Sequence, residues 1–353
     1  MSAPADARLY QRGPLRTIWP SPARPARRRS AAKADAGYGA PASPSWREVD
    51  WPSVTAQADV LGAKVNYVSL GEGDETVVFI HGLGGSWQNW LENVPAIAAS
   101  GRRAIALDLP GFGRSAMPVE PISITEFAHV VDELCEQLGT GPVHLVGNSM
   151  GGFTAAEAAI RHPARVTTLT LVDAAGITSN QVAKNPIAER FAITALGGNG
   201  AATATDADGR PRALALMRRP AGIHAVMAIV ARHPTRLARD LLGEQLHSLG
   251  ARGFMPALDA LFHYDFSERL GEIGCPTLII QGEKDVLVPL GDAYEFERRI
   301  PKSTVLTFAD TGHVPMLERP TAFNAAVLEF IGQDAAPHEP DAEQSPMLAD
   351  GRA

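Results

Sequence analysis

The chain has 353 residues, of which 45% are hydrophobic and 20% charged, and its formal net charge at pH 7 is −7. This composition is typical of a globular protein with a sizeable core and excludes fibrous and largely disordered classes. The acidic balance argues against nucleic-acid binding, because nucleic-acid-binding domains carry a basic patch or stripe. No apolar run approaches the ~20 residues that span a bilayer, so no integral membrane segment is expected.

Residues 1–50 differ in composition from the rest of the chain. They are rich in Pro, Ala and Arg and show no periodicity, so they cannot bury enough apolar surface to offset the entropy of ordering. The arginine cluster at 27–29 is followed by no apolar run, which argues against a signal peptide. Residues 1–50 and 335–353 are therefore predicted to be disordered tails, and deleting residues 1–45 is expected to change neither turnover nor thermal midpoint.

From residue 64 onward, short apolar and β-branched runs alternate with helical patterns. Such runs are typical of strands that are covered on both faces, and their alternation with helices indicates a parallel sheet. The fold class is therefore α/β, a doubly wound and mostly parallel sheet whose core comprises residues 51–174 and 274–334. Strands are expected at 65–70, 76–80, 103–107, 143–146, 169–172, 277–280 and 304–308, and helices at 87–99, 124–138, 151–162, 292–300 and 321–331.

One interval, residues 175–273, interrupts this alternation. Its pattern is mostly helical and contains no convincing strand. An insertion between two strands of a sheet is the expected form of a lid over a site. A helical cap inserted before the last two strands is therefore predicted.

Both cysteines, Cys135 and Cys275, are expected to be buried free thiols. Two cysteines cannot form a disulfide framework, and no C-x-x-C metal spacing occurs. Free thiols are typical of a reducing compartment, so a cytoplasmic location is predicted.

The segment 147–151 reads Gly-Asn-Ser-Met-Gly, a G-x-S-x-G pattern that directly follows a predicted strand and opens a predicted helix. A serine nucleophile on a sharp strand-to-helix turn requires this context. The start of the helix presents N–H groups and a positive dipole end to developing negative charge. Ser149 is therefore the predicted nucleophile.

A serine hydroxyl needs a base, and the base needs a carboxylate that fixes its tautomer. His313 lies on a Gly-containing loop just beyond the last predicted strand, at the edge of the sheet where open α/β folds bind ligands. Asp285 follows the preceding strand on a loop and is the favoured acid, with Asp173 as a competitor and Asp310 as a weaker one. The chain order Ser149, Asp285, His313 is the one that G-x-S-x-G hydrolases show.

The glycine-rich segment 81–85 follows the second core strand. Backbone at this position can direct an N–H group into the site. The main-chain N–H groups of Leu83 and Met150 are the predicted oxyanion hole, whereas His81 is interpreted as a residue that braces the loop.

Together, the segments 81–85, 108–115, 147–152, 282–285 and 311–313 resemble the α/β-hydrolase superfamily, in its serine-nucleophile, esterase- and lipase-like branch. The resemblance covers about residues 60–332 and implies the α/β-hydrolase fold, with Asp108 as a loop-ordering carboxylate. Ser149 departs from the Asp nucleophile of dehalogenases and epoxide hydrolases, which disfavours those chemistries. The elbow is similar to that of carbon–carbon bond hydrolases acting on ring-cleavage products, but the Gly84–Ser86 loop and Val314 after the histidine differ from their usual pattern.

The predicted activity is hydrolysis of a carboxylic ester of a small or medium hydrophobic substrate through an acyl-enzyme, with no metal and no organic cofactor. Two alternatives stay open. One is a carbon–carbon bond hydrolase for ring meta-cleavage products, in which a cap arginine would hold the substrate carboxylate. The other is a non-catalytic small-molecule binding protein on the same fold. The candidate cap arginines are Arg190, Arg218, Arg219, Arg232 and Arg236.

Overall fold

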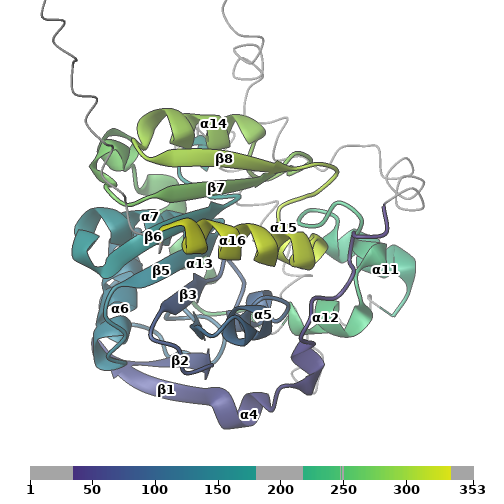
Figure 1. The fold of residues 1–353 in the computed structure, drawn as a ribbon, viewed down its shortest axis with the longest axis horizontal. Helices are drawn as coiled ribbons and strands as arrows, with labels where there is room; N and C mark the ends of the chain where they lie inside the picture. Colours follow the sequence, from purple (N-terminus) through teal and green to yellow (C-terminus); the bar gives the residue numbers. More distant parts are fainter. Residues whose placement is uncertain (1–34, 180–217, 247, 249, 335–353) are drawn as a thin grey trace, which may run out of the picture.

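The computed structural model describes residues 35–179, 218–246, 248 and 250–334. Its centre is an eight-stranded sheet with the order β1-β2-β4-β3-β5-β6-β7-β8 (Figure 1). β2 pairs antiparallel with β1 and β4, and all other neighbours pair parallel, so the predicted mostly parallel sheet is confirmed. The strands are β1 Thr55–Val60, β2 Ala63–Leu70, β3 Thr76–Ile80, β4 Arg103–Leu107, β5 Val143–Asn148, β6 Val166–Val172, β7 Thr277–Gly282 and β8 Ser303–Phe308.

Each face of the sheet has its own hydrophobic core. In β3, Val78 and Ile80 point into one cluster, while Val77 and Phe79 point into the other. This alternation is the two-residue period of a strand with both faces covered. It explains why the central strands are continuously apolar in sequence.

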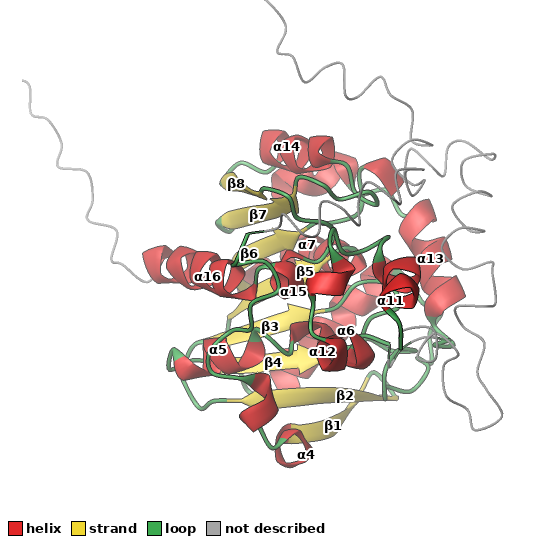
Figure 2. Ribbon diagram, turned by 90° about the vertical axis from the view of Figure 1, so that its right-hand side faces the viewer, coloured by secondary structure: helices red, strands yellow, loops and turns green. Residues whose placement is uncertain are grey.

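Helices cover both faces, as Figure 2 shows, and the predicted doubly wound architecture is confirmed. Four helices contribute buried side chains to the first core cluster, the one that contains Val78 and Ile80. They are α6 (Ile124–Gln137), α7 (Met150–Arg161), α13 (Phe254–His263) and α14 (Leu290–Arg299). The second core cluster, which contains Val77 and Phe79, receives buried side chains from α5 (Val94–Ala99), α11 (Pro220–Met227), α12 (Arg239–Glu244), α15 (Pro315–Glu318) and α16 (Pro320–Asp334). None of the helices in the described ranges is long and apolar enough to cross a bilayer.

The described part of the interval between β6 and β7 is helical and contains no strand within residues 218–246 and 250–273. Besides α11, α12 and α13 it holds the 3-10 helices η5 (Pro234–Arg236) and η6 (Ser267–Glu272). Figure 1 shows α11 and α12 beside the carboxyl ends of the parallel strands. The Asn89 side-chain amide donates to the Gln245 carbonyl oxygen at 2.7 Å, which joins this interval to the loop after β3.

Two expectations about the elements need adjustment. The predicted helix over 87–99 is divided into the 3-10 helix η2 (Trp87–Trp90) and α5, which has Pro95 in its first turn, a common helix-start position. Strand β1 is absent from the predicted strands. Only one of its six residues, Val60, is buried, so this edge strand lacks the apolar pattern of the central ones.

The interpretation of residues 1–50 as a disordered tail is wrong for residues 35–50. Tyr38 and Ala42 are buried hydrophobic residues, with only 2% and 5% of their surface exposed. The 3-10 helix η1 (Trp46–Glu48) follows, and Arg47 pairs with Asp240 of α12. The segment is ordered by contacts with distant parts of the chain, which composition and local periodicity do not reveal. Deleting residues 1–45 would remove the Tyr38 and Asp35 contacts, so this deletion is now expected to lower the thermal midpoint. The expectation about residues 1–34 and 335–353 lies outside the described residues.

Candidate active site

Ser149 lies at a sharp turn between β5 and α7, with φ 56° and ψ −118°. The turn brings strand and helix so close that its flanking glycines have no room for a side chain. A Cβ at Gly147 would lie 2.2 Å from the Gly151 carbonyl oxygen, and one at Gly151 would lie 2.2 Å from the Ile80 carbonyl oxygen. The G-x-S-x-G spacing is therefore a packing requirement of this turn.

The main chain around Ser149 is fixed by neighbouring elements. Its N–H donates to the Val172 carbonyl at the end of β6 (2.9 Å), and its own carbonyl accepts from the Ala175 N–H (3.1 Å). The Asn148 side-chain amide donates to the carbonyls of Val172 and His313, at 3.1 Å each. Asn148 thus links the serine turn to the loop that carries His313.

His313 and Asp285 lie in direct contact. Nδ1 of His313 is 2.7 Å from Oδ2 of Asp285, and both side chains are almost completely buried. The other Asp285 oxygen, Oδ1, accepts from the main-chain N–H groups of Leu287 (2.7 Å) and Val288 (3.2 Å). Because both oxygens of Asp285 are hydrogen-bonded, the carboxylate is fixed in orientation. It accepts a hydrogen bond from Nδ1–H of His313, which leaves Nε2 as an acceptor.

Asp173, the competing acid, lies next to this pair but has no hydrogen bond to the histidine among those in the described residues. Its Oδ1 accepts from the Gly282 N–H (2.9 Å) and the Gln281 amide (2.8 Å), while Oδ2 has no partner in the described part of the chain. Burial, and then the negative charge of Asp285, raise the pKa of Asp173 well above its usual value. Asp173 therefore holds a proton more tightly than an exposed aspartic acid does.

Asp310, the weaker candidate acid, is engaged elsewhere. Its two oxygens pair with Arg232 Nε (3.0 Å) and His233 Nε2 (2.7 Å). Both partners come from the interval between β6 and β7, so Asp310 connects that interval to the loop after β8.

The two predicted oxyanion donors flank the serine turn. A Cβ at Gly82 would lie 3.1 Å from Ser149 Cβ, which shows how closely the loop after β3 approaches the serine. Leu83 follows in this loop, and Met150 is the first residue of α7. Among the described residues, the main-chain N–H groups of Leu83 and Met150 have no hydrogen-bond acceptor.

His81 and Asp108 hold this loop in place. Nε2 of His81 accepts from the Leu109 N–H (3.0 Å), so the ring proton is on Nδ1, which donates to the Gly82 carbonyl (2.8 Å). Burial lowers the pKa of His81 and favours this neutral form. Asp108 accepts from the N–H of Trp87 through one oxygen and from Arg114 N–H through the other. His81 therefore braces the loop, and its nitrogens are not available as a base.

One buried glutamate, Glu318, is a part of this region that local sequence context does not reveal. Its carboxylate accepts from the Gly312 N–H at 2.9 Å and the Val314 N–H at 3.4 Å, the two residues that flank His313. The turn of α15, which begins two residues after His313, brings these groups together. The position of Glu318, five residues after the histidine, is the one available sequence signal.

The carboxylates and histidine raise the question of a metal site. Asp173, Asp285 and His313 each offer one ligand atom, and these atoms lie within 4.8 Å of one another. The 2.7 Å contact between His313 and Asp285 is a direct hydrogen bond, shorter than the separation of two ligands that share one ion. The arrangement therefore fits a hydrogen-bonded pair better than a metal centre.

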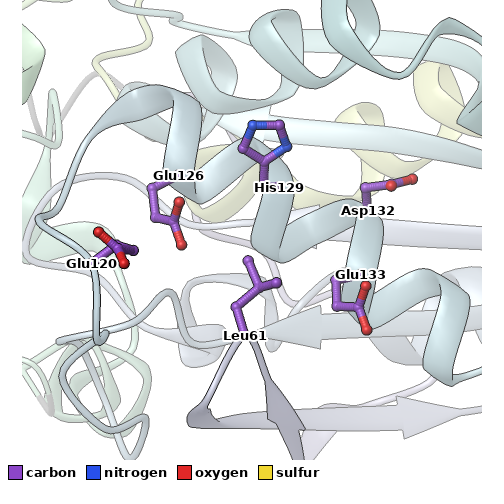
Figure 3. A pocket seen from close by; sticks show the side chains of 6 residues that line it. All are labelled: Leu61, Glu120, Glu126, His129, Asp132 and Glu133. Atoms are coloured by element: carbon purple, nitrogen blue, oxygen red, sulfur yellow. The ribbon is translucent and has the colours of Figure 1, made fainter.

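A surface depression at the β1–β2 turn and α6 contains none of the residues described above (Figure 3). It is lined by Leu61, Glu120, Glu126, His129, Asp132 and Glu133.

Comparisons with known proteins give relatives of several activities. The chain is 30% identical over 306 residues to a dihydrolipoyllysine-residue acetyltransferase component of an acetoin cleaving system from Cupriavidus necator, covering 84% of this chain and 74% of that one. It is 29% identical to a 2-hydroxy-6-oxononadienedioate/2-hydroxy-6-oxononatrienedioate hydrolase from Escherichia coli, covering 76% and 91%. A solved structure of a putative lipase from Acinetobacter baumannii has a TM-score of 0.62 at 21% identity, covering 80% and 91%.

The family model described as the alpha/beta hydrolase fold matches residues 75–320. This range includes the serine turn, all three candidate acids and His313, and it agrees with the sheet order and the two covered faces described above. The resemblance expected from the sequence motifs is thereby confirmed, and the chain belongs to the α/β-hydrolase family.

Proposed function

We propose that this hydrolase cleaves carboxylic esters of small or medium hydrophobic substrates through an acyl-enzyme on Ser149. The observation that carries the proposal is the 2.7 Å contact between His313 Nδ1 and Asp285 Oδ2, with Asp285 fixed by two further N–H donors. This contact orients the imidazole so that Nε2 is the free base for a serine hydroxyl. Ser149, Asp285 and His313 are the proposed catalytic residues.

In this mechanism, His313 Nε2 takes the hydroxyl proton while Ser149 Oγ attacks the ester carbonyl carbon. The N–H groups of Leu83 and Met150 donate to the oxyanion of the tetrahedral intermediate. They are suited to this because neither has another acceptor within the described part of the chain. The imidazolium, stabilised by Asp285, then protonates the leaving alcohol as the intermediate collapses to the acyl-enzyme. His313 next activates water, which releases the acid and regenerates Ser149.

The described part of the inserted interval supports a role as a cap. The ring of Phe254 in α13 lies 3.1 Å from where a Cβ of Gly84 would be, so it packs on the loop after β3. The Gly253 N–H donates to the Gly111 carbonyl (3.0 Å), which anchors the same end of α13 to the loop after β4. We infer that this interval covers the site and limits the size of the acyl group.

A carbon–carbon bond hydrolase is the second candidate, because one of the relatives named above has that activity. It requires a cation for the substrate carboxylate. Of the candidate arginines, Arg232 pairs with Asp310, Arg190 lies outside the described residues, and the other three, Arg218, Arg219 and Arg236, are exposed. The described arginines therefore favour the ester over the dienoate.

The proposal is tested with short activated esters, a ring-cleavage dienoate and a fluorophosphonate probe. The wild type is expected to turn over esters with a burst and to be labelled at Ser149 alone. Ser149→Ala is expected to lose ester turnover and labelling while keeping its fold, as judged by circular dichroism. Faster turnover of the dienoate than of any ester would favour the carbon–carbon hydrolase, and absence of both burst and turnover would favour a binding protein.

We also infer a reducing compartment, such as the cytoplasm. Neither Cys135 nor Cys275 forms a disulfide; Cys135 is buried as expected, whereas Cys275 is only partly buried. Burial raises the pKa of the Cys135 thiol to about 11, which makes it inert.

A further inference from the structure

The segment of residues 35–47 precedes the range matched by the family model, yet it contacts both the core and the inserted interval. At its start, Asp35 pairs with Arg319 at 2.9 Å, and at its end Arg47 pairs with Asp240 of α12 at 2.6 Å. Between them, the Gly39 N–H donates to the main-chain carbonyl of Glu318 at 2.7 Å. We call residues 35–47 the N-terminal strap.

Tyr38 is the large buried side chain of the strap. Its hydroxyl donates to the Glu318 carboxylate and accepts from the His233 N–H at 2.7 Å. The ring packs edge-on against His233, with centroids 5.1 Å apart, and the Arg319 guanidinium lies 5.5 Å from its centroid. Burial and the charge of Glu318 raise the pKa of Tyr38, so the hydroxyl keeps its proton and remains a donor.

Glu318 connects Tyr38 to the histidine loop through hydrogen bonds. One carboxylate receives the Tyr38 hydroxyl, the N–H groups of Gly312 and Val314, and the Arg232 N–H at 2.8 Å. The His313 N–H itself donates to the Val230 carbonyl at 2.7 Å. The backbone of the histidine loop is thus hydrogen-bonded to Glu318 on one side and to Val230 on the other. The Tyr38 hydroxyl bonds both to Glu318 and to the His233 N–H.

We propose that Tyr38 is a positioning residue for His313 and acts through Glu318. The proposal rests on the catalytic role assigned to His313 above. Without the hydroxyl, the buried Glu318 carboxylate lacks one donor, and the His233 N–H lacks its acceptor. The histidine loop then loses part of its restraint, and small misplacements of a catalytic group reduce turnover strongly.

The test compares two variants that each remove one tyrosine hydroxyl from a buried glutamate. Tyr38→Phe keeps the aromatic packing with His233 and Arg319. The matched control is Tyr264→Phe, because the Tyr264 hydroxyl donates at 2.6 Å to Glu157, which is buried in α7 and has no contact with the histidine loop among the described hydrogen bonds. Steady-state turnover of a short ester, thermal midpoint and amide hydrogen exchange at 312–314 are measured for both.

Tyr38→Phe is expected to lower kcat by about tenfold while changing KM by less than about threefold, because positioning acts on the chemical step. Amide exchange at 312–314 is expected to accelerate in Tyr38→Phe and to stay unchanged in Tyr264→Phe. Equal kcat losses in the two variants, or unchanged exchange at 312–314 in Tyr38→Phe, would overturn the proposal.

A double-mutant cycle tests the route through Glu318. The kcat losses of Tyr38→Phe and Glu318→Gln are expected to be non-additive, since both act on one hydrogen bond. Additive losses in a folded double variant would contradict the route. If the wild type neither turns over esters nor is labelled at Ser149, the proposed function fails, whereas the exchange measurement still decides whether Tyr38 restrains the loop.

Discussion

Asp173 and Asp285 are chemically identical side chains at the ends of neighbouring strands, and their surroundings give them different states. Asp285 has hydrogen-bond donors on both oxygens, including His313. Asp173 has donors on Oδ1 alone, and burial together with the charge of Asp285 raises its pKa. Asp173 therefore holds a proton more tightly than an ordinary aspartic acid, whereas Asp285 is the acid that contacts the imidazole of His313.

Asp285→Asn is expected to lower ester turnover by about 10⁴, by analogy with serine proteases. The carboxamide oxygen would take the place of Oδ1 opposite the Leu287 and Val288 N–H groups, which turns the NH₂ group toward His313 Nδ1. Nδ1 must then be an acceptor, so the proton moves to Nε2, where a base is needed. Steady-state kinetics with an activated ester measure the loss.

Asp173→Asn is the matched comparison and is expected to cost less than about tenfold, or about 1.4 kcal/mol. Asparagine is neutral and nearly isosteric with the protonated acid, and its oxygen can still accept from Gly282 and Gln281. If Asp173→Asn is the more damaging of the two substitutions, Asp173 is the catalytic acid and the assignment of Asp285 is wrong.

Among elements, the contact between α14 and the residues after β6 is expected to depend on pH. Asp292 in α14 accepts from the Thr178 N–H (2.8 Å) and the Thr178 hydroxyl (2.6 Å). Burial, and to a lesser extent the charge of Asp285, raise the pKa of Asp292 to about 7. Because the folded-state pKa lies above the unfolded one, the folded state binds the proton more tightly, and this favours folding only at low pH.

The wild type is therefore expected to lose stability relative to Asp292→Asn as the pH rises from about 4 to 7, by up to about 1.4 kcal/mol per pH unit. Above this window the difference should level off. Urea unfolding of both proteins across the range measures it. A stability difference that does not change with pH would show that Asp292 does not titrate there in the folded state.

The elements also show what a sequence can predict. The bounds of β3 and β4 are those expected, because strands with both faces buried are short apolar runs. The edge strand β1 and the N-terminal strap escaped prediction for a common reason: neither has a local apolar signature. The strap is ordered through Tyr38 and Glu318, which are 280 positions apart in the chain.

For the site, the placement of residues at strand ends was enough to bring Ser149, Asp285 and His313 into consideration, since carboxyl ends of parallel strands meet at one edge. The raised pKa of Asp173 and the contacts of Glu318 could not be predicted from the sequence. Both depend on burial and on contacts between segments that meet only once the chain is folded.

At the scale of the whole molecule, two hydrophobic cores lie on the two faces of one sheet. Ile80 and Leu107 contribute to the first, and Phe79 and Ala106, which precede them in β3 and β4, to the second. The candidate site lies where the strands of this sheet end, so the two cores together hold the serine turn, the two acids and the histidine loop. A rigid support of this kind allows the interval between β6 and β7 to differ in size without displacing the groups of the candidate site.

The backbone at Ser149 has a further consequence for the protein as a whole. With φ at 56° and ψ at −118°, its Cβ is crowded in a region that glycine alone enters easily. The molecule is thus less resistant to unfolding by about 1–3 kcal/mol than it would be with a relaxed turn. Ser149→Gly is expected to melt at a higher temperature than Ser149→Ala, although both lack the hydroxyl, and calorimetry on the two inactive variants measures the difference. If Ser149→Ala melts higher, the turn accommodates an L side chain without penalty. If Ser149→Gly melts at the higher temperature, the backbone conformation that presents the serine hydroxyl also lowers the thermal stability of the protein.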